Sequence, residues 1–202
     1  MKLHEFPGAP NPKKVRVYLA EKGIEVASVP VDIITGENRK PAFLEKNPMG
    51  GLPVLELDDG SYLAESLAII EYFEDLHPNP PMIGTAPLER ARVRALERLI
   101  ELSVLGRIAV IFQNTHPLFA SRLKQSADAA ESARGALATN LAVLDAKIGS
   151  NTFAAGDRPT IADCTLLAAL QFAEFAQIPI DPAHKNIQRW YESFKQRPSA
   201  AA

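Results

Sequence analysis

A proline-rich break at residues 77–81 divides this 202-residue chain into two different sequence patterns. The sequence there, HPNPP, cannot continue a helix, because proline lacks a backbone N–H and its ring clashes with the preceding turn. Before the break, short apolar runs alternate with helical stretches; after it, the apolar spacing is helical almost to the end. We therefore predict two domains, at residues 1–77 and 88–202, joined by a linker at residues 78–87.

The first pattern predicts the order β-α-β-α-β-β-α, built on a four-stranded mixed sheet. Strands are expected at residues 2–6, 26–31, 54–57 and 61–64, and helices at residues 13–22, 41–45 and 66–77. Gly23 stands where a helix-ending glycine belongs, and Ser66 is expected to cap the third helix. The dipeptide Asp59-Gly60 predicts a hairpin turn, and Pro30, which has no N–H to donate, predicts an edge strand.

The second pattern predicts an all-helical domain. Helices are expected at residues 88–112, 128–148, 160–176 and 186–195. Thr160 and Asp163 have the spacing of a capping box at the start of the third of these, with Asp in place of the usual Glu or Gln.

Composition argues against several classes of function. Lys and Arg number 22 against 24 Asp and Glu, so the net charge of -2 offers nothing to attract nucleic acid or an anionic membrane. No apolar run approaches the roughly 18 residues that a membrane-spanning helix needs. A single cysteine cannot form an internal disulfide, the N-terminus lacks a secretory pattern, and the four histidines share no metal-ligand spacing. We expect a cytoplasmic protein without a metal.

Two segments carry the chemical information. Residues 47–55 read NPMGGLPVL, and residues 65–69 read ESLAI. Pro53, placed directly before a strand, suits a cis peptide that exposes the backbone of Leu52 to an extended peptide. The hydroxyl of Ser66 at a helix N-terminus suits a carboxylate, and Glu65 suits an ammonium group. Together these features predict a site for a small zwitterionic peptide.

These segments resemble motifs of the cytosolic glutathione S-transferase superfamily. Residues 47–55 are similar to its N-P-x-G-x-V-P-x-L segment, with Leu52 in place of Val, and residues 65–69 are similar to its E-S-x-A-I segment. Residues 155–157 and 160–163 resemble the folding signature of its C-terminal domain. The resemblance covers nearly the whole chain and implies an α/β thioredoxin-like N-terminal domain followed by an all-α domain.

The resemblance also implies roles for individual residues. The Leu52 backbone beside cis Pro53 is expected to pair with the cysteinyl part of glutathione, and Glu65 and Ser66 are expected to hold the γ-glutamyl end. Arg39 or Lys40 is expected to meet the glycyl carboxylate, the alternative being a solvated basic turn. Glutathione is then a substrate, and no further cofactor is implied. The family also implies a homodimer, through the helix that carries Arg90, Arg94 and Glu97 and through the edge at residues 65–76.

The catalytic position departs from the family pattern. Most members place Tyr, Ser or Cys at the end of the first strand or in the next loop, whereas residues 6–12 here read FPGAPNP, without a hydroxyl or a thiol. The chain most resembles an atypical subgroup that also lacks this residue. We expect the glutathione thiolate to be stabilised by the start of the first helix, with a donor from Asn11 (backbone or side chain) or a held water.

Residues 112–117, FQNTHP, gather polar groups at the end of the first long helix of the second domain. Asn114 and His116 are expected to face the electrophile there, with His116 polarising it or holding a water. The alternative is an ordinary helix end with a favourable histidine. The predicted function is conjugation of glutathione to a small apolar electrophile. The rival is a non-catalytic glutathione-binding or protein-interaction module, and a peroxidase or thiol-transfer role is disfavoured because residue 9 is not Cys.

Overall fold

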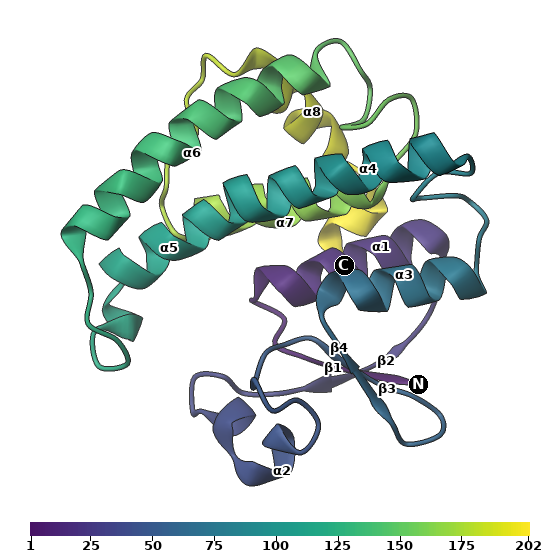
Figure 1. Cartoon of the computed structure of the whole chain (residues 1–202), viewed down its shortest axis with the longest axis vertical. Helices are drawn as coiled ribbons and strands as arrows, with labels where there is room; N and C mark the ends of the chain where they lie inside the picture. The colour runs from purple at the N-terminus through teal and green to yellow at the C-terminus, as the bar shows by residue number, and fades with distance from the viewer. The chain divides into compact units, whose positions relative to one another are not determined.

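The computed structural model describes residues 1–202 and divides them into two compact units (Figure 1). The first unit contains residues 1–82 and 198–202, and the second contains residues 83–197. The sequence had placed the last five residues in the second domain. They join the first unit because the Lys13 ammonium donates to the carbonyl of Ala200 at 2.9 Å and the Ser199 hydroxyl donates to Glu21.

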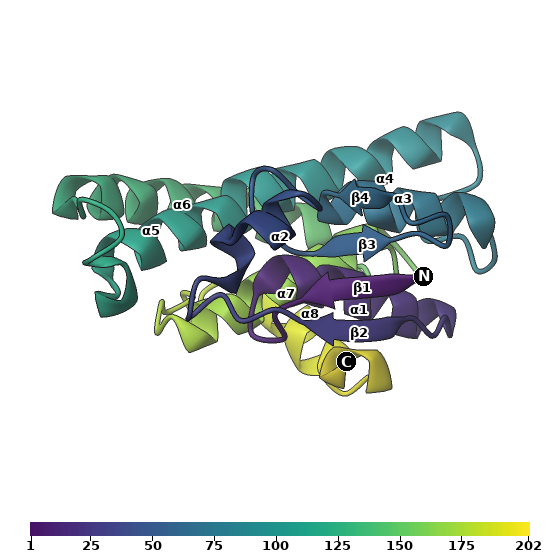
Figure 2. The ribbon, with the colours of Figure 1, turned by 90° about the horizontal axis from the view of Figure 1, so that it is seen from below.

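The first unit is built on a four-stranded mixed sheet in the order β2-β1-β3-β4 (Figure 2). Its strands are β1 (Lys2–Glu5), β2 (Ala27–Pro30), β3 (Val54–Glu56) and β4 (Tyr62–Ala64). β1 runs parallel to β2 and antiparallel to β3, and β3 and β4 form the predicted hairpin around Gly60. Pro30 lies in edge strand β2, where its missing N–H costs the sheet no hydrogen bond.

Three helices complete this unit: α1 (Pro10–Lys22), α2 (Pro41–Leu44) and α3 (Ser66–Leu76), with 3-10 turns at Glu37–Arg39 and Pro198–Ala201. α1 and α3 pack side by side on one face of the sheet (Figures 1 and 2). A small apolar cluster of Val31, Phe43 and Val54 joins α2 to the sheet. The thioredoxin-like order predicted from the sequence is confirmed.

Two helix starts differ from the prediction. α1 begins at Pro10 instead of residue 13, because proline in the first turn has no N–H to lose and a φ that already fits the helix. Ser66 does not cap α3: it is the first helical residue, and the cap position belongs to Glu65. Glu65 has a φ of 70°, a left-handed value that is costly for a residue with a side chain.

The second unit is all-helical, as predicted. Its helices are α4 (Pro87–Ile100), α5 (Gly106–Thr115), α6 (Ala127–Ile148), α7 (Ile161–Phe175) and α8 (Lys185–Phe194), with a 3-10 turn at Pro117–Phe119. Residues 161–170 of α7 are buried without exception, so this helix forms the centre of the unit. Glu97 of α4 is also buried, and it accepts a hydrogen bond of 3.0 Å from the Thr165 hydroxyl. It therefore does not lie on an outer face of α4, although a charged residue of an amphipathic helix ordinarily does.

The predicted helix at residues 88–112 is interrupted by a π-helical turn at Glu101–Leu105, which separates α4 from α5. A π turn displaces the usual i to i−4 bonding of the backbone. The carbonyl of Ser103 accepts instead from Asn140 Nδ2 of α6 at 2.8 Å. Apolar spacing could not reveal this turn, because the buried positions continue through it.

The start of α7 is fixed by a buried carboxylate. Asp163 Oδ2 accepts from the Thr160 N–H at 2.8 Å, which confirms that half of the predicted capping box. Its other oxygen, Oδ1, accepts from the Ala154 N–H at 2.7 Å and from Trp190 Nε1 at 2.8 Å. Burial raises the pKa of Asp163, against the opposing effect of these hydrogen bonds. One side chain thus joins the loop before α7, α7 itself and α8. No helix of the structure is both long and apolar enough to cross a membrane.

Candidate functional site

Strand register brings the predicted glutathione-binding segments of the first unit to one edge of its sheet. His4 near the end of β1 pairs with Val54 at the start of β3, and Val54 pairs with Ala64 at the end of β4. The loop to α1, the Leu52-Pro53 peptide and the start of α3 therefore leave the sheet at the same edge. β2 runs parallel to β1, so the connection that carries Arg39 and Lys40 leaves there too.

The N-terminus of α1 has no side-chain cap and no acidic side chain beside its positive end. Its cap residue, Ala9, offers no side-chain acceptor, and its first turn contains no acidic residue. Pro10 and Pro12 have no N–H, the Ala9 N–H donates to Phe6 at 3.0 Å, and the Lys13 N–H donates to Ala9 at 3.2 Å. Within this turn the N–H of Asn11 is left without a partner in the chain. The helix therefore offers one backbone donor and its positive end to an anion.

The side chain of Arg16, on α1, holds the loop between β1 and α1 in place. Its guanidinium donates to the Pro7 carbonyl at 2.9 Å and forms an ion pair with the buried Glu5. Glu5 also accepts the Ser28 hydroxyl at 2.7 Å, so its carboxylate links β1, β2 and α1. Sequence reasoning missed Arg16, because a basic residue on an amphipathic helix is ordinarily solvated.

The Leu52-Pro53 peptide is cis, as predicted. The Leu52 side chain packs against the apolar cluster beneath α2. Its backbone N–H and carbonyl, by contrast, bond to no group in the chain, because the ladder with β1 begins only at Val54. These two groups are free to pair with an extended peptide ligand in the manner of an added strand.

Asn38 and Asn47 hold the loop before Leu52, a contribution that sequence reasoning missed. Asn47 is buried; its Nδ2 donates to the Gly51 carbonyl at 3.0 Å, and its Oδ1 accepts from the Met49 N–H at 3.1 Å. Asn38 Nδ2 donates to the Gly50 carbonyl at 2.7 Å. Gly50 has a φ of 63°, and a Cβ there would lie 2.7 Å from the Asn38 carbonyl oxygen, so only glycine fits. An Asn before Pro-x-Gly is the signal that could have identified Asn47.

The start of α3 is a second open helix N-terminus. The N–H groups of Ser66, Leu67 and Ala68 donate to no group in the chain, and the first backbone bond comes from Ile69 to Glu65 at 3.0 Å. The Ser66 hydroxyl lies beside them, and the exposed Glu65 carboxylate has no cationic partner in the chain. Three backbone N–H groups, the Ser66 hydroxyl and the Glu65 carboxylate thus lie together. This combination is suited to the end of a peptide that carries both a carboxylate and an ammonium group.

Arg39 and Lys40 are placed differently. Arg39 donates from Nη1 to the Met49 carbonyl at 3.0 Å, so it braces the loop before Leu52. Lys40 is exposed at the cap position of α2. Its charge contributes to lowering the pKa of Asp32, whose carboxylate is bound mainly by Thr35 and Ile34. Lys40 is therefore the freer of the two cations for a ligand carboxylate.

Asn114 and His116 lie in the second unit, at the end of α5. Both ends of the Asn114 amide are occupied: Nδ2 donates to Val110 at 2.9 Å, and Oδ1 accepts from the Ser126 N–H at 2.9 Å. His116 Nδ1 accepts from the Leu118 N–H at 3.2 Å, and its ring lies 4.6 Å from that of Phe112. The hydrogen bonds of Asn114 fasten the start of α6, whereas His116 keeps its second ring nitrogen for another group. No group of three or more His, Cys, Asp or Glu side chains gathers anywhere to hold a metal ion.

Both units match known families. Residues 3–81 match the family described as "Glutathione S-transferase, N-terminal domain", and residues 108–198 match "Glutathione S-transferase, C-terminal domain". "Glutathione S-transferase 2" of Saccharomyces cerevisiae is 32% identical, over 98% of this chain and 87% of that protein. "Maleylacetoacetate isomerase" of Pseudomonas aeruginosa is 34% identical, over 90% of this chain and 85% of that protein.

Solved structures agree with this assignment. Gtt2 from Saccharomyces cerevisiae superimposes with a TM-score of 0.93 at 33% identity, covering 100% of this chain and 99% of that one. A glutathione S-transferase domain-containing protein from Marinobacter aquaeolei gives a TM-score of 0.92 at 36% identity, covering 99% of this chain and all of the other.

Proposed function

Because this chain belongs to the glutathione S-transferase family, we propose that it binds glutathione at the sheet edge of its first unit and joins it, through its sulfur, to a small apolar electrophile. The thiol proton passes first to solvent water, and the thiolate sulfur then forms a bond to an electrophilic carbon. In a substitution, the bond from that carbon to its leaving group breaks, and the leaving group departs with the electron pair. In an addition, the electron pair of the electrophile's double bond or strained ring moves to an acceptor atom, which takes up a proton. Glutathione is a substrate of this reaction, which uses no cofactor.

Unpaired backbone groups at the sheet edge support the binding step. The Leu52 N–H and carbonyl are suited to the cysteinyl residue of glutathione, which would extend the sheet by one short strand. The free N–H groups at the start of α3, with the Ser66 hydroxyl, are suited to the γ-glutamyl carboxylate, and Glu65 to its ammonium. Lys40 is suited to the glycyl carboxylate. Each end of the tripeptide then has a group of opposite charge.

The observation that carries the proposal is the free Asn11 N–H at the start of α1. A thiol with a pKa of about 8.5 is only about 3% ionised at pH 7, and lowering that pKa by two units requires roughly 2.7 kcal/mol. A helix N-terminus supplies roughly 0.3–1 kcal/mol, and up to about 2 kcal/mol when partly buried. A hydrogen bond to a charged acceptor adds roughly 1.5–3 kcal/mol. Together, the N-terminus of α1 and the Asn11 N–H supply roughly 1.8–5 kcal/mol, a range that includes the roughly 2.7 kcal/mol needed to lower the thiol pKa by two units. A hydroxyl at residue 9 is then not required.

The electrophile is assigned to the second unit, with His116 at the end of α5 as the group that polarises it or holds a water. An aromatic group around Phe112 supports an apolar substrate there. The rings of Phe119, Phe172 and Phe175 all lie within 5.1–5.7 Å of the Phe112 ring. Asn114 is a weaker candidate than His116, since its amide is already occupied.

A panel of electrophiles tests the proposal against the rival of a non-catalytic glutathione-binding module. The panel comprises an activated aryl halide, an epoxide, an α,β-unsaturated ketone and an isothiocyanate, each assayed with glutathione. We expect a glutathione-dependent rate above the uncatalysed rate for at least one class. If calorimetry shows glutathione binding while no class is accelerated, the chain is a binding module and the transferase proposal is wrong.

A further inference from the structure

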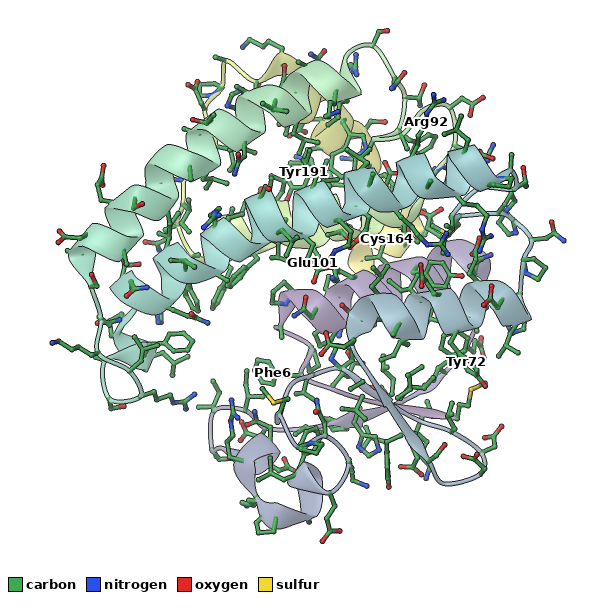
Figure 3. The ribbon with its side chains drawn as sticks, viewed as in Figure 1. Phe6, Tyr72, Arg92, Glu101, Cys164 and Tyr191 are labelled. Carbon is green, nitrogen blue, oxygen red and sulfur yellow. The ribbon has the colours of Figure 1, made fainter.

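A cavity of about 670 Å³ lies on the second unit, between the end of α7, the segment that follows it and α8. Its floor is apolar and includes the buried side chains of Leu170, Ala173, Ile178 and Ile187. Tyr191, labelled in Figure 3, lines it from α8. The volume is within the range of about 300–1,000 Å³ typical of small-molecule sites. Neither Asn114 nor His116 lines this cavity, and neither does any residue assigned above to glutathione.

The charged side chains that line the cavity, Glu174 and Glu192, are both acidic. Glu192 is compensated by Lys195, whose ammonium lies 2.6 Å from its carboxylate. Glu174 is exposed to solvent and has no basic partner, and its carboxylate interacts with the Tyr191 hydroxyl. The cavity therefore contains one carboxylate whose charge no cation of the chain balances.

Tyr191 holds that carboxylate in place. Burial raises the pKa of Tyr191, and the Glu174 carboxylate raises it further, so the hydroxyl stays protonated and remains a donor at physiological pH. A fixed negative charge and an aromatic ring beside an apolar floor are complementary to a cation with an apolar body. They disfavour an anion, which would bring a second negative charge into the cavity.

We propose that this cavity is a second ligand site, which binds small organic cations carrying an apolar group. The ammonium pairs with Glu174, while the alkyl or aryl body covers the apolar floor. Lys195, whose ammonium is 5.5 Å from the centre of the Tyr191 ring, is held by Glu192 and leaves Glu174 to the ligand. The site is independent of the proposed transfer reaction.

Trp190, the only tryptophan of the chain, makes binding directly measurable. Its ring stacks on that of Tyr191 at 6.4 Å and an interplanar angle of 20°, so a ligand in the cavity should change its fluorescence. We would titrate the protein at pH 7 with three probes of similar shape and different charge. They are the cationic para-hexylbenzylamine, the neutral para-hexylbenzyl alcohol and the anionic para-hexylbenzoate. We expect the protonated amine to bind at least about tenfold more tightly than the alcohol, a difference near 1.4 kcal/mol, and the benzoate to bind most weakly.

The matched variants are Glu174→Gln, which keeps the hydrogen bond of Tyr191 and removes the charge, and Glu131→Gln, an exposed position on α6 outside the cavity. Glu174→Gln should weaken amine binding about tenfold and leave alcohol binding unchanged, whereas Glu131→Gln should change neither. Equal affinity of the wild-type protein for amine and alcohol would overturn the proposal, and this comparison needs no variant. Competition between the amine and an electrophile in the conjugation assay would also overturn it, since the cavity would then belong to the electrophile site.

Discussion

Ser66 combines two properties that the sequence could not separate. As the first helical residue of α3 it leaves its hydroxyl free of any capping bond, and it is followed by two more N–H groups without partners. A serine whose hydroxyl capped the helix would have been committed to the fold. The observed placement leaves the hydroxyl without a capping bond, and we propose that it binds the ligand carboxylate.

Ser66→Ala should therefore leave the fold intact and weaken glutathione binding by roughly 1–3 kcal/mol, because one donor to the ligand carboxylate is lost. Isothermal titration calorimetry measures the affinity, and Ser193→Ala, an exposed serine on α8, is the matched control. Unchanged affinity in Ser66→Ala would rule out the hydroxyl as the carboxylate anchor.

Glu56 gives the first unit a defined acid sensitivity. Lys2 and His4 on the neighbouring strand β1 donate hydrogen bonds to its carboxylate, each at 2.8 Å, and lower the pKa of Glu56 from 4.5 to about 2. A carboxylate with a depressed folded-state pKa stabilises the fold above its unfolded pKa, and this contribution disappears as the pH falls through the folded value.

Glu56→Gln should consequently be less stable than the wild-type protein at pH 6, and the difference should shrink as the pH falls from about 4.5 toward about 2. Urea denaturation at several pH values checks this. A stability difference that stays constant across that range would show that the ion pair with Lys2 and His4 is not its source.

At the scale of elements, Asp163 fixes the start of α7 through the hydrogen bonds it accepts. Asp163→Ala removes the acceptor of buried donors from Thr160, Ala154 and Trp190 at once. Each unsatisfied buried donor costs about 1–3 kcal/mol, so the free energy of unfolding should fall by more than about 3 kcal/mol. Denaturant unfolding followed by the fluorescence of Trp190 measures the loss, with the exposed Asp157→Ala as control. A loss below about 1 kcal/mol would contradict this role.

The order of the elements, the four-stranded mixed sheet and the all-helical second unit were predictable because proline, glycine and apolar spacing act locally. Edge strand β2 and the end of α1 at Gly23 follow from single residues with restricted or unusual backbone geometry. The π turn was not predictable, since the buried apolar spacing continues through it and its contact with Asn140 comes from another helix. The burial of Glu97 was not predictable for a similar reason: its partner Thr165 is distant in the sequence.

The candidate site was predictable in its residues and not in its donors. The motifs named Leu52, Pro53 and Ser66 and predicted an exposed Leu52 backbone, but the unpaired N–H groups at the starts of α1 and α3 emerged only from the hydrogen bonds. The supporting residues Arg16, Asn38 and Asn47 were missed, because each acts on a carbonyl or N–H that the sequence does not display.

At the scale of the whole molecule, we propose a homodimer, with α4 as part of its interface. Leu88 of α4 is 61% exposed, Leu102 of the π turn that follows α4 is 59% exposed, and Ala95 between them in the sequence is exposed too. These three residues form an exposed apolar stripe that is suited to a second copy related by a twofold axis.

Light scattering at micromolar concentration should accordingly give a mass near twice 22.0 kDa. Leu102→Glu should shift the protein toward the monomer, because it brings a charge to the apolar stripe. The control is Val143→Glu, an exposed apolar position on α6. A monomeric wild-type protein would contradict the dimer, and equal dissociation by both variants would contradict the role of α4.

The claim that the Asn11 N–H and the end of α1 activate glutathione is tested most directly by an ultraviolet titration of the bound thiolate. Two variants separate the donors: Asn11→Ala keeps the N–H and removes the side chain, whereas Asn11→Pro removes the N–H at a first-turn position that tolerates proline. We expect the bound thiol to titrate well below the free value of about 8.5 in the wild-type protein and in Asn11→Ala. The activity of Asn11→Ala should be within a few-fold of the wild-type activity. In Asn11→Pro the pKa of the bound thiol should be higher than in the wild-type protein. A bound thiol that titrates at about 8.5 or above in the wild-type protein would contradict thiolate activation and favour the binding-module alternative.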